Sequence, residues 1–362
     1  LKLSSATFWV HLAGCMQEMG YMSCPADPDL WLKEQTDRKG RRYYSYILCY
    51  VDDLLVIHHN PRRVMDKING FLPLKPDSVG PPEMYLGAKL KKKTFEDGTS
   101  AWGLSPAKYV QQAVKNVETY LKSNLEGRYS LPKRGENPFP VDYAPEEDVS
   151  PLLEPDVATY YMQLIGILRW MCELGRIDIC TEVSMLSSYS AMPREGHLEA
   201  ALHVFSYLKS KSNSRLIFDP MEPDLGDSNF VECDWSDFYP GASEALPPNA
   251  PKPLGKGVTL RMFVDSDHAG DKVSRRSRTG FVIFLNYGMI DWLSKKQSTV
   301  ETSVFGAEFC AMKHGIENLR GIRYKLRMMG IPVKGASYVY GDNMSVVTNA
   351  SKPESTLNKK SN

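Results

Sequence analysis

The sequence has little of what marks a secreted, zinc-binding or membrane-spanning protein. Its seven cysteines form no Cys-x-x-Cys pair, so they indicate neither a zinc site nor a disulfide framework, and we expect a reducing, intracellular compartment. No stretch approaches eighteen uninterrupted apolar residues, which argues against a membrane-spanning helix. The chain starts with neither an initiator methionine nor a signal-peptide layout, and we expect it to be a fragment of a longer protein.

What is present is the composition of a folded protein with segregated charge. A hydrophobic fraction of 42% over 362 residues fits two or three domains of ordinary size. The formal net charge of +1 hides an asymmetry, because residues 251–362 carry 18 Lys and Arg against 9 Asp and Glu, which leaves the rest of the chain at −8. A basic C-terminal third indicates a polyanionic partner such as nucleic acid.

Hydrophobic periodicity predicts alternating helices and strands separated by two stretches rich in Pro, Gly and acid. Strands are expected at 30–33, 44–51, 54–57, 85–90, 101–104, 260–265, 279–286, 289–294 and 337–342. Helices are expected at 6–20, 62–71, 106–122, 303–329 and 344–350, with a mostly helical region at 155–211. Residues 34–41 are predicted to form a charged hairpin loop.

Two adjacent aspartates, Asp52 and Asp53, stand between two apolar strands at 44–51 and 54–57. Neighbouring carboxylates repel each other and resist burial unless a cation compensates them. A tight turn between rigid strands would project both acids toward one divalent ion, for which carboxylate oxygens are suitable ligands. For the pair taken alone, a solvent-exposed turn is the simpler alternative.

Three further acids follow apolar elements near the C-terminus. Asp265 ends one predicted strand, Glu308 lies early in the long helix, and Asp342 ends the next strand. Acids from separate elements can converge at one edge of a sheet and hold two Mg²⁺ ions about 4 Å apart. Each acid taken singly could instead be a capping or surface residue, and Asp267 competes with Asp265 as the first ligand.

Basic residues follow the first and third of these strands, where they could meet a phosphate backbone. Such cations position a nucleic acid through phosphate contacts rather than by reading bases. The alternative is a solvated loop. The predicted nucleic-acid-binding residues are Lys272, Arg275, Arg276, Arg278, Lys295 and Lys296.

The string Tyr50-Val51-Asp52-Asp53, with apolar runs on both sides, resembles the signature hairpin of reverse transcriptases. Together with Gly20-Tyr21 before it and Tyr85-Leu86-Gly87 after it, this string resembles successive polymerase blocks of copia-type (Pseudoviridae) retrotransposons. The C-terminal order of three strands, a helix, a strand and a helix resembles the ribonuclease H domain of the same elements. The resemblance covers nearly all of the chain.

This resemblance implies an α/β and α+β multidomain protein: a partial reverse transcriptase palm with a helical connection, then an RNase H-like mixed-sheet domain. The implied domains are a partial palm and thumb region at 1–130, a linker at 131–155, a helical connection at 156–220, a linker or long loop at 221–257, and a C-terminally truncated RNase H-like domain at 258–362.

The family's catalytic and metal-binding roles carry over to the acids that match its motifs. These are Asp52, Asp53, Asp265, Glu308 and Asp342, with Mg²⁺ or Mn²⁺ as the cofactor. The family pattern places the metal ligand first in its block, which favours Asp265 over Asp267.

The implied function is Mg²⁺-dependent hydrolysis of RNA in RNA·DNA hybrids by the C-terminal domain of a transposable-element Pol polyprotein. RNA-directed DNA polymerisation, with primer-template and deoxynucleotides, and the element's DNA integration are expected only of the intact parent. The matching region lacks the upstream palm aspartate and the last RNase H acid, so a catalytically inert nucleic-acid-binding relic is the alternative. The resemblance implies a location in the cytoplasm, within virus-like particles, and in the nucleus.

Overall fold

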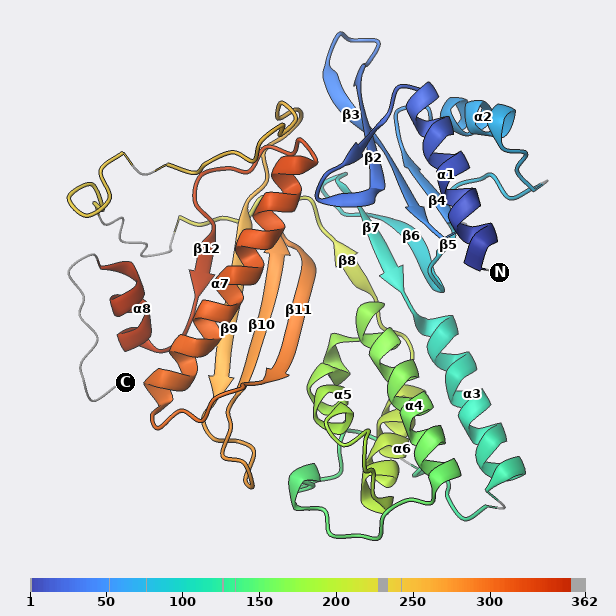
Figure 1. Cartoon of the computed structure of the whole chain (residues 1–362), viewed down its shortest axis with the longest axis vertical. Helices are drawn as coiled ribbons and strands as arrows, with labels where there is room; N and C mark the ends of the chain where they lie inside the picture. Colours follow the sequence, from blue (N-terminus) through green and yellow to red (C-terminus); the bar gives the residue numbers. More distant parts are fainter. Residues whose placement is uncertain are drawn as a thin grey trace. The chain divides into compact units, whose positions relative to one another are not determined.

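A computed structural model describes residues 2–51, 53–75, 77–125, 127–133, 135–226, 234–241 and 243–352 of the chain (Figure 1). Its contacts divide the chain into two compact units built from separate segments. Unit 1 consists of Leu1–Glu83, Gly241–Leu260 and Asn318–Ser337, and unit 2 consists of Met84–Pro240, Arg261–Glu317 and Tyr338–Asn362.

Unit 1 contains an antiparallel sheet with two helices packed against it. The strands, in the spatial order β1-β2-β3-β4, are β1 (Met22–Cys24), β2 (Asp27–Thr36), β3 (Arg42–Tyr50) and β4 (Asp53–Ile57). The helices are α1 (Lys2–Glu18) and α2 (Pro61–Phe71). Met16 of α1 and Ile68 of α2 are fully buried against Ile47 of β3, which shows why the strand alternates buried and exposed residues.

The charged segment 34–41 departs from the sequence-based expectation. β2 continues to Thr36 and β3 starts at Arg42, so the predicted hairpin loop is shorter than expected. Glu34 pairs with Tyr44 in the ladder and its carboxylate bonds to Arg42. Residues 37–41 form the predicted hairpin loop, whereas residues 34–36 extend β2 because their pairing with β3 continues to Thr36.

A second part of the unit 1 core joins β1–β3 to residues after 318. Met328 is buried against Cys24, Leu30, Leu32 and Tyr44. The Tyr46 hydroxyl donates a hydrogen bond of 2.8 Å to the Met329 carbonyl oxygen. The end of the long helix is therefore anchored in the core of unit 1.

Unit 2 contains a second antiparallel sheet followed by a cluster of helices. The strands, in the order β5-β6-β7-β8, are β5 (Met84–Tyr85), β6 (Ala88–Thr94), β7 (Ser100–Ser105) and β8 (Leu216–Phe218). The helical elements are α3 (Ala107–Asn124), η1 (Pro145–Glu147), α4 (Pro155–Glu173), η2 (Ile177–Ile179), α5 (Cys180–Ser187) and α6 (Glu195–Ser210). Apolar faces of α3, α4, α5 and α6 meet in one buried core that includes Leu164 and Phe205.

The segment between α3 and α4 lies against these helices. The Ser206 hydroxyl of α6 donates to the Pro132 carbonyl oxygen at 2.7 Å, and His197 bonds to the Pro145 carbonyl oxygen at 2.9 Å. Phe139 and Tyr143 pack on the helical core. A stretch rich in Pro and Gly is here a packed surface segment.

The third sheet, also in unit 2, is mixed and has the order β11-β10-β9-β12. Its strands are β9 (Leu260–Asp267), β10 (Arg278–Leu285), β11 (Gly288–Lys296) and β12 (Tyr338–Tyr340), accompanied by α7 (Val304–Met328) and α8 (Met344–Ser351). β10 and β11 pair antiparallel, whereas β12 pairs parallel with β9. A side chain at Gly315 of α7 would approach the Met262 sulfur to 2.8 Å, so the glycine lets the helix lie close on β9.

The structure confirms a mixed α and β protein with more than one compact unit. The domain ranges expected from the sequence are contiguous while the units are not, and those ranges stay a prediction. Among the described helices, none has both the length and the apolar content of a membrane span.

Candidate functional site

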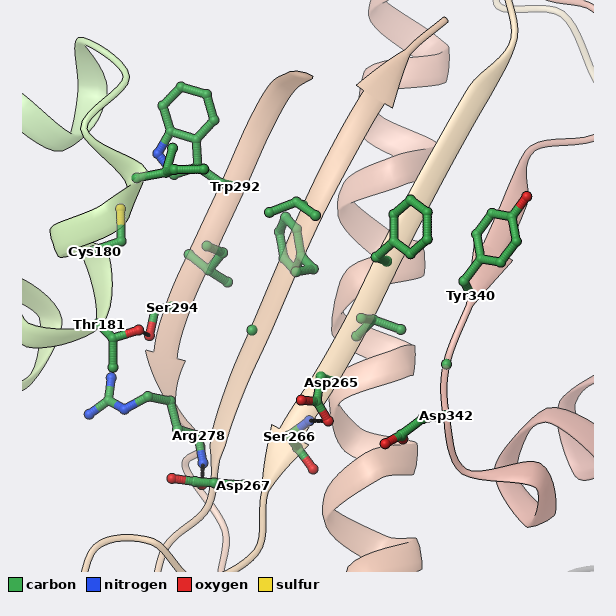
Figure 2. Close-up of a pocket in the computed structure, with 18 residues that line it drawn as sticks. Cys180, Thr181, Asp265, Ser266, Asp267, Arg278, Trp292, Ser294, Tyr340 and Asp342 are labelled. Atoms are coloured by element: carbon green, nitrogen blue, oxygen red, sulfur yellow. Dashed lines mark hydrogen bonds between the residues drawn. The ribbon is translucent and has the colours of Figure 1, made fainter. Parts of the chain in front are cut away.

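Three acidic side chains converge in unit 2 where β9, β12 and α7 meet. The parallel register sets Tyr340 beside Phe263, so continuing each strand by two residues brings Asp342 level with Asp265. Figure 2 shows Asp265 near the end of β9 and the Asp342 carboxylate, just after β12, directed toward it. Glu308, in the second turn of α7, completes the group, and one carboxylate oxygen from each residue lies within 4.8 Å of the others.

The three acids sit in different surroundings. Asp265 and Asp342 are exposed, whereas Glu308 is only 7% exposed. Burial raises the pKa of Glu308, and the neighbouring charges of Asp265 and Asp342 raise it further. The group therefore carries an electrostatic cost that a bound cation would remove.

Local structure holds the two strand acids in place. The Asp265 carboxylate accepts the backbone N–H of Ser266 at 2.8 Å. Directly after Asp342, the Asn343 side chain caps α8 by accepting the N–H groups of Ser345 and Val346, which fixes the chain direction there.

The structure separates Asp267 from this group. The Asp267 carboxylate accepts the backbone N–H of Arg278 on the neighbouring strand β10 (Figure 2). Only Asp265 of the two competing acids belongs to the three-carboxylate cluster. The geometry thus agrees with the preference for Asp265, whose role as a ligand stays a prediction.

A cavity of about 760 Å³ opens beside the acidic group, on the sheet face drawn in Figure 2. Its wall is largely aromatic and aliphatic, and the rings of Phe263 and Tyr340 stack with centroids 4.6 Å apart. Trp292 of β11 and Cys180 at the start of α5 contribute the far side. Composition and strand periodicity carried no signal for this cavity, because it forms between segments about 80 residues apart.

Three of the six predicted nucleic-acid-binding cations have partners within the chain. Lys272 forms a 2.7 Å ion pair with Glu147, and Lys296 forms one of 2.9 Å with Asp271. The guanidinium of Arg278 donates to the Ser184 hydroxyl at 2.8 Å, and burial lowers the pKa of Arg278.

The other three cations, Arg275, Arg276 and Lys295, are exposed. Arg275 adopts a positive φ of 57°, and its N–H donates to the Asp271 carbonyl oxygen in the loop between β9 and β10. A nucleic-acid contact for any of the six stays a prediction.

The aspartate hairpin of unit 1 is described only in part. Asp53 is exposed and begins β4, where it pairs with Tyr50 at the end of β3. Asp52 lies outside the described residues. Within the described ranges, Asp53 joins no cluster of three potential metal ligands. The metal-binding role of both aspartates stays a prediction.

Three curated relatives show what the chain is similar to. It is 24% identical over 354 residues to the Retrovirus-related Pol polyprotein from transposon TNT 1-94 of Nicotiana tabacum, covering 96% of this chain and 22% of that protein. It is 22% identical over 361 residues to the Retrovirus-related Pol polyprotein from transposon RE1 of Arabidopsis thaliana, covering 98% and 20%. It is 27% identical over 305 residues to the Putative transposon Ty5-1 protein YCL074W of Saccharomyces cerevisiae, covering 82% and 79%. The chain is similar to Pol polyproteins of transposons.

These likenesses support the predicted origin in a retroelement Pol polyprotein. The chain spans about a fifth of the length of the first two relatives. No protein-family model matches the chain, and no solved structure matches it. The assignment to the reverse transcriptase and ribonuclease H regions stays a prediction.

Proposed function

We propose that unit 2 carries a nuclease site of the ribonuclease H type, which hydrolyses RNA in RNA·DNA hybrids, within a piece of a retroelement Pol polyprotein. The observation that carries this proposal is the convergence of Asp265, Glu308 and Asp342 from three different elements, with carboxylate oxygens within 4.8 Å. Negative groups gathered this closely, one of them buried, repel each other unless a divalent cation compensates them.

The donor set fits Mg²⁺ or Mn²⁺. All three groups offer carboxylate oxygen, the hard ligand that these ions prefer, and the group contains no thiolate or imidazole of the kind that favours zinc. Divalent ions bound there would neutralise phosphate charge and lower the pKa of an attacking water. The chain's contribution is to hold the three carboxylates on β9, on α7 and in the short link between β12 and α8, next to rigid elements.

Polymerisation belongs, in this proposal, to the intact parent protein. Asp52 and Asp53 would be two of its metal ligands, with primer-template and deoxynucleotides as its substrates. The RNA·DNA hybrid is the substrate assigned to this chain. The virus-like particle in the cytoplasm and the nucleus are the compartments in which the parent would act.

A cleavage assay tests the nuclease proposal. The purified chain is incubated with a labelled RNA·DNA hybrid and Mg²⁺, beside the variants Asp265→Asn and Glu308→Gln. The wild type should release RNA fragments, and each variant should be slower by about 100-fold or more, because each removes a carboxylate from the group. Asp267→Asn is the matched control, since it removes an equal charge two residues away, and it should keep most of the rate.

The same assay separates the proposal from its rival. If the wild type binds the hybrid but cleaves it no faster than Asp265→Asn does, the nuclease proposal is wrong. That result would support an inert nucleic-acid-binding relic. Cleavage that survives both variants would show that the three acids are not the site.

A further inference from the structure

Two cysteines stand on either side of the turn between α4 and α5. Cys172 lies in the last turn of α4, and Cys180 is the first residue of α5. They are the closest spaced of the seven cysteines in the sequence. Their spacing matches no zinc or redox motif, so the sequence alone assigns the pair no role. Any relation between the two thiols is therefore a property of the fold.

The turn after α4 reverses the chain sharply. Gly175 adopts a positive φ of 97°, and its N–H donates to the Cys172 carbonyl oxygen at 2.9 Å. The N–H of Arg176 donates to the Met171 carbonyl oxygen at 3.0 Å. These two bonds with a left-handed glycine form a Schellman motif, which ends a helix and turns the chain away from its axis. The short helix η2 then leads directly into Cys180.

This turn brings the two thiols into contact. Cys172 is 8% exposed within the helical core of unit 2, and Cys180 packs against that core. The Cys172 thiol donates a hydrogen bond to the sulfur of Cys180. This bond raises the pKa of Cys172, and burial raises it further, so Cys172 keeps its proton at neutral pH. The pair thus consists of a buried thiol directed at a second sulfur.

The second sulfur is accessible. Cys180 is half-buried, and it lines the cavity of about 760 Å³ beside the converging acids (Figure 2). A small polar oxidant can reach Cys180 from this cavity, whereas Cys172 is enclosed in the core. Because oxidation of cysteine follows its accessibility, Cys180 is the member of the pair that meets an oxidant first.

Contacts with the neighbouring sheet hold the start of α5 in place. The hydroxyl of Thr181, the residue after Cys180, donates to the Ser294 hydroxyl of β11 at 3.2 Å. One turn later, Ser184 accepts the guanidinium of Arg278 on β10 at 2.8 Å. These bonds oppose a movement of Cys180 away from α4, so the thiol pair lies between anchored elements.

We propose that Cys172 and Cys180 form a reversible disulfide when the protein meets a peroxide. Cys180 is the residue oxidised first, and Cys172 is the resolving residue. The proposal does not rest on the nuclease function, because neither thiol belongs to the three-carboxylate cluster. It adds a modification site on the cavity wall next to that cluster.

The reaction with hydrogen peroxide takes two balanced steps. The Cys180 sulfur attacks one peroxide oxygen, so an S–O bond forms, the O–O bond breaks, and the other oxygen leaves as water with the thiol proton. The Cys172 sulfur then attacks the resulting sulfenic acid. An S–S bond forms, the S–O bond breaks, and the Cys172 proton leaves with the oxygen as a second water. The two sulfurs lose two electrons, which the peroxide gains.

The proposed bond would be transient in a reducing compartment. Disulfides of intracellular proteins are usually redox-sensing rather than structural, because cellular thiols reduce them again. Thiol–disulfide exchange would therefore return the pair to the dithiol once the peroxide is consumed. While it lasts, the bond closes residues 172–180 into a ring and locks the turn between α4 and α5.

Peptide mapping after oxidation tests the proposal. The reduced full chain is treated with hydrogen peroxide, its remaining thiols are alkylated, and it is digested with trypsin. Arg176 stands between the two cysteines, so trypsin releases them on separate peptides, 170–176 and 177–194. Mass spectrometry should find these peptides linked, lighter than their sum by two hydrogens, and separated again by dithiothreitol. Recovery of the two peptides only in unlinked form, or of Cys180 linked to another cysteine, would overturn the proposal.

Single substitutions test the assigned order of oxidation. Cys172→Ala should lose the linked peptide and stop at a sulfenic acid on Cys180, which dimedone traps on peptide 177–194. Cys180→Ser should lose the linked peptide and leave Cys172 unmodified. A dimedone adduct on Cys172 in this variant, formed as fast as the one on Cys180, would contradict the order. Cys310→Ser is the matched control, since Cys310 is a half-buried cysteine of the same unit, and it should form the linked peptide as the wild type does.

Phenylarsine oxide tests the contact between the thiols without any oxidant or substitution. This trivalent arsenical binds two neighbouring thiols through two As–S bonds and releases its oxygen as water with their protons. Pre-treatment of the wild type should protect Cys172 and Cys180 together from alkylation and should abolish the peroxide-linked peptide. Alkylation of both cysteines at the untreated rate would show that the thiols are not adjacent and would overturn the proposal.

Discussion

Glu308 is the most buried of the three converging carboxylates, and its neighbours make its charge still more costly. A group with this environment lowers the stability of the metal-free protein at neutral pH, because the folded state favours the protonated form. A substitution that removes the charge of Glu308 and keeps the shape of its side chain should therefore stabilise the metal-free protein.

We therefore expect Glu308→Gln to melt about 1–3 °C above the wild type in EDTA at pH 7. The folded-state pKa of Glu308 is raised, so protonation stabilises the wild type fully below the unfolded-state pKa near 4.3, and this stability is lost as the pH rises through the folded-state pKa. The difference in melting temperature between Glu308→Gln and the wild type should increase as the pH rises from 4 to 7. Differential scanning calorimetry measures it, and a variant that melts below the wild type throughout would contradict the account.

Glu244 shows the opposite electrostatics in unit 1. Its carboxylate accepts hydrogen bonds from Arg323 and Arg327, of which the Arg323 bond contributes most, and these bonds hold its pKa at about 2. The side chain is 39% exposed, so solvent screens the pair and its contribution is about 1 kcal/mol or less.

Because the folded-state pKa of Glu244 is lowered, its stabilisation should be present above the unfolded-state pKa near 4.3 and should vanish as the pH falls toward 2. Glu244→Gln should lower the urea midpoint at pH 7 and leave it unchanged at pH 2. Glu83→Gln, at an exposed carboxylate of the same unit, serves as the control and should have no effect at either pH. A Glu244→Gln effect that persists at pH 2 would reject the ion-pair explanation.

At the scale of elements, the junction between α4 and α5 depends on one buried charge. Arg176 has no exposed surface, and its guanidinium donates to both oxygens of Asp178 at 2.9 and 2.7 Å. The Tyr207 hydroxyl of α6 donates to the same carboxylate at 2.9 Å. The Tyr207 bond thus joins the η2 segment to α6.

Breaking such a pair from one side leaves the other charge without compensation. Because the Asp178 side chain is 35% exposed and solvent can compensate part of its charge, Arg176→Ala should lower the free energy of unfolding by about 1–3 kcal/mol, whereas the double variant Arg176→Met, Asp178→Asn should be less damaging. Urea unfolding followed by circular dichroism measures both. A double variant that is no more stable than Arg176→Ala would indicate that packing, rather than charge, dominates this junction.

Much of this element order could be predicted from the sequence because its signals are local. The starts of β9 and α7 follow from hydrophobic periodicity, and Glu308 lies early in its helix as predicted. β9 continues to Asp267, two residues past the predicted end at Asp265. Asp267 has the same parity on β9 as Asp265, so alternation could not separate the two. The bond from Arg278 on the next strand separates them, and it is a tertiary contact.

The contacts that the sequence did not reveal are long-range. The pairing of Lys272 with Glu147 joins residues 125 positions apart, and no spacing rule connects them. The shortened loop between β2 and β3 has a different cause, because cross-strand pairing overrode a charged local composition.

At the scale of the whole molecule, the compact units do not follow the chain in contiguous blocks. The helix α7 contributes Val304–Glu317 to unit 2 and its remaining residues to unit 1. Glu308 therefore lies on a helix whose far end, at Met328, is buried in a core built by β1, β2 and β3.

The central claim is that Asp265, Glu308 and Asp342 together bind divalent metal. Manganese binding to the full chain, measured by electron paramagnetic resonance of the free ion, tests this claim without depending on catalysis. Wild type and Asp267→Asn should take up Mn²⁺ alike, while Asp265→Asn and Asp342→Asn should bind at least about tenfold more weakly, since each loses one oxygen ligand. Equal binding by Asp265→Asn and the wild type, or a loss confined to Asp267→Asn, would contradict the account.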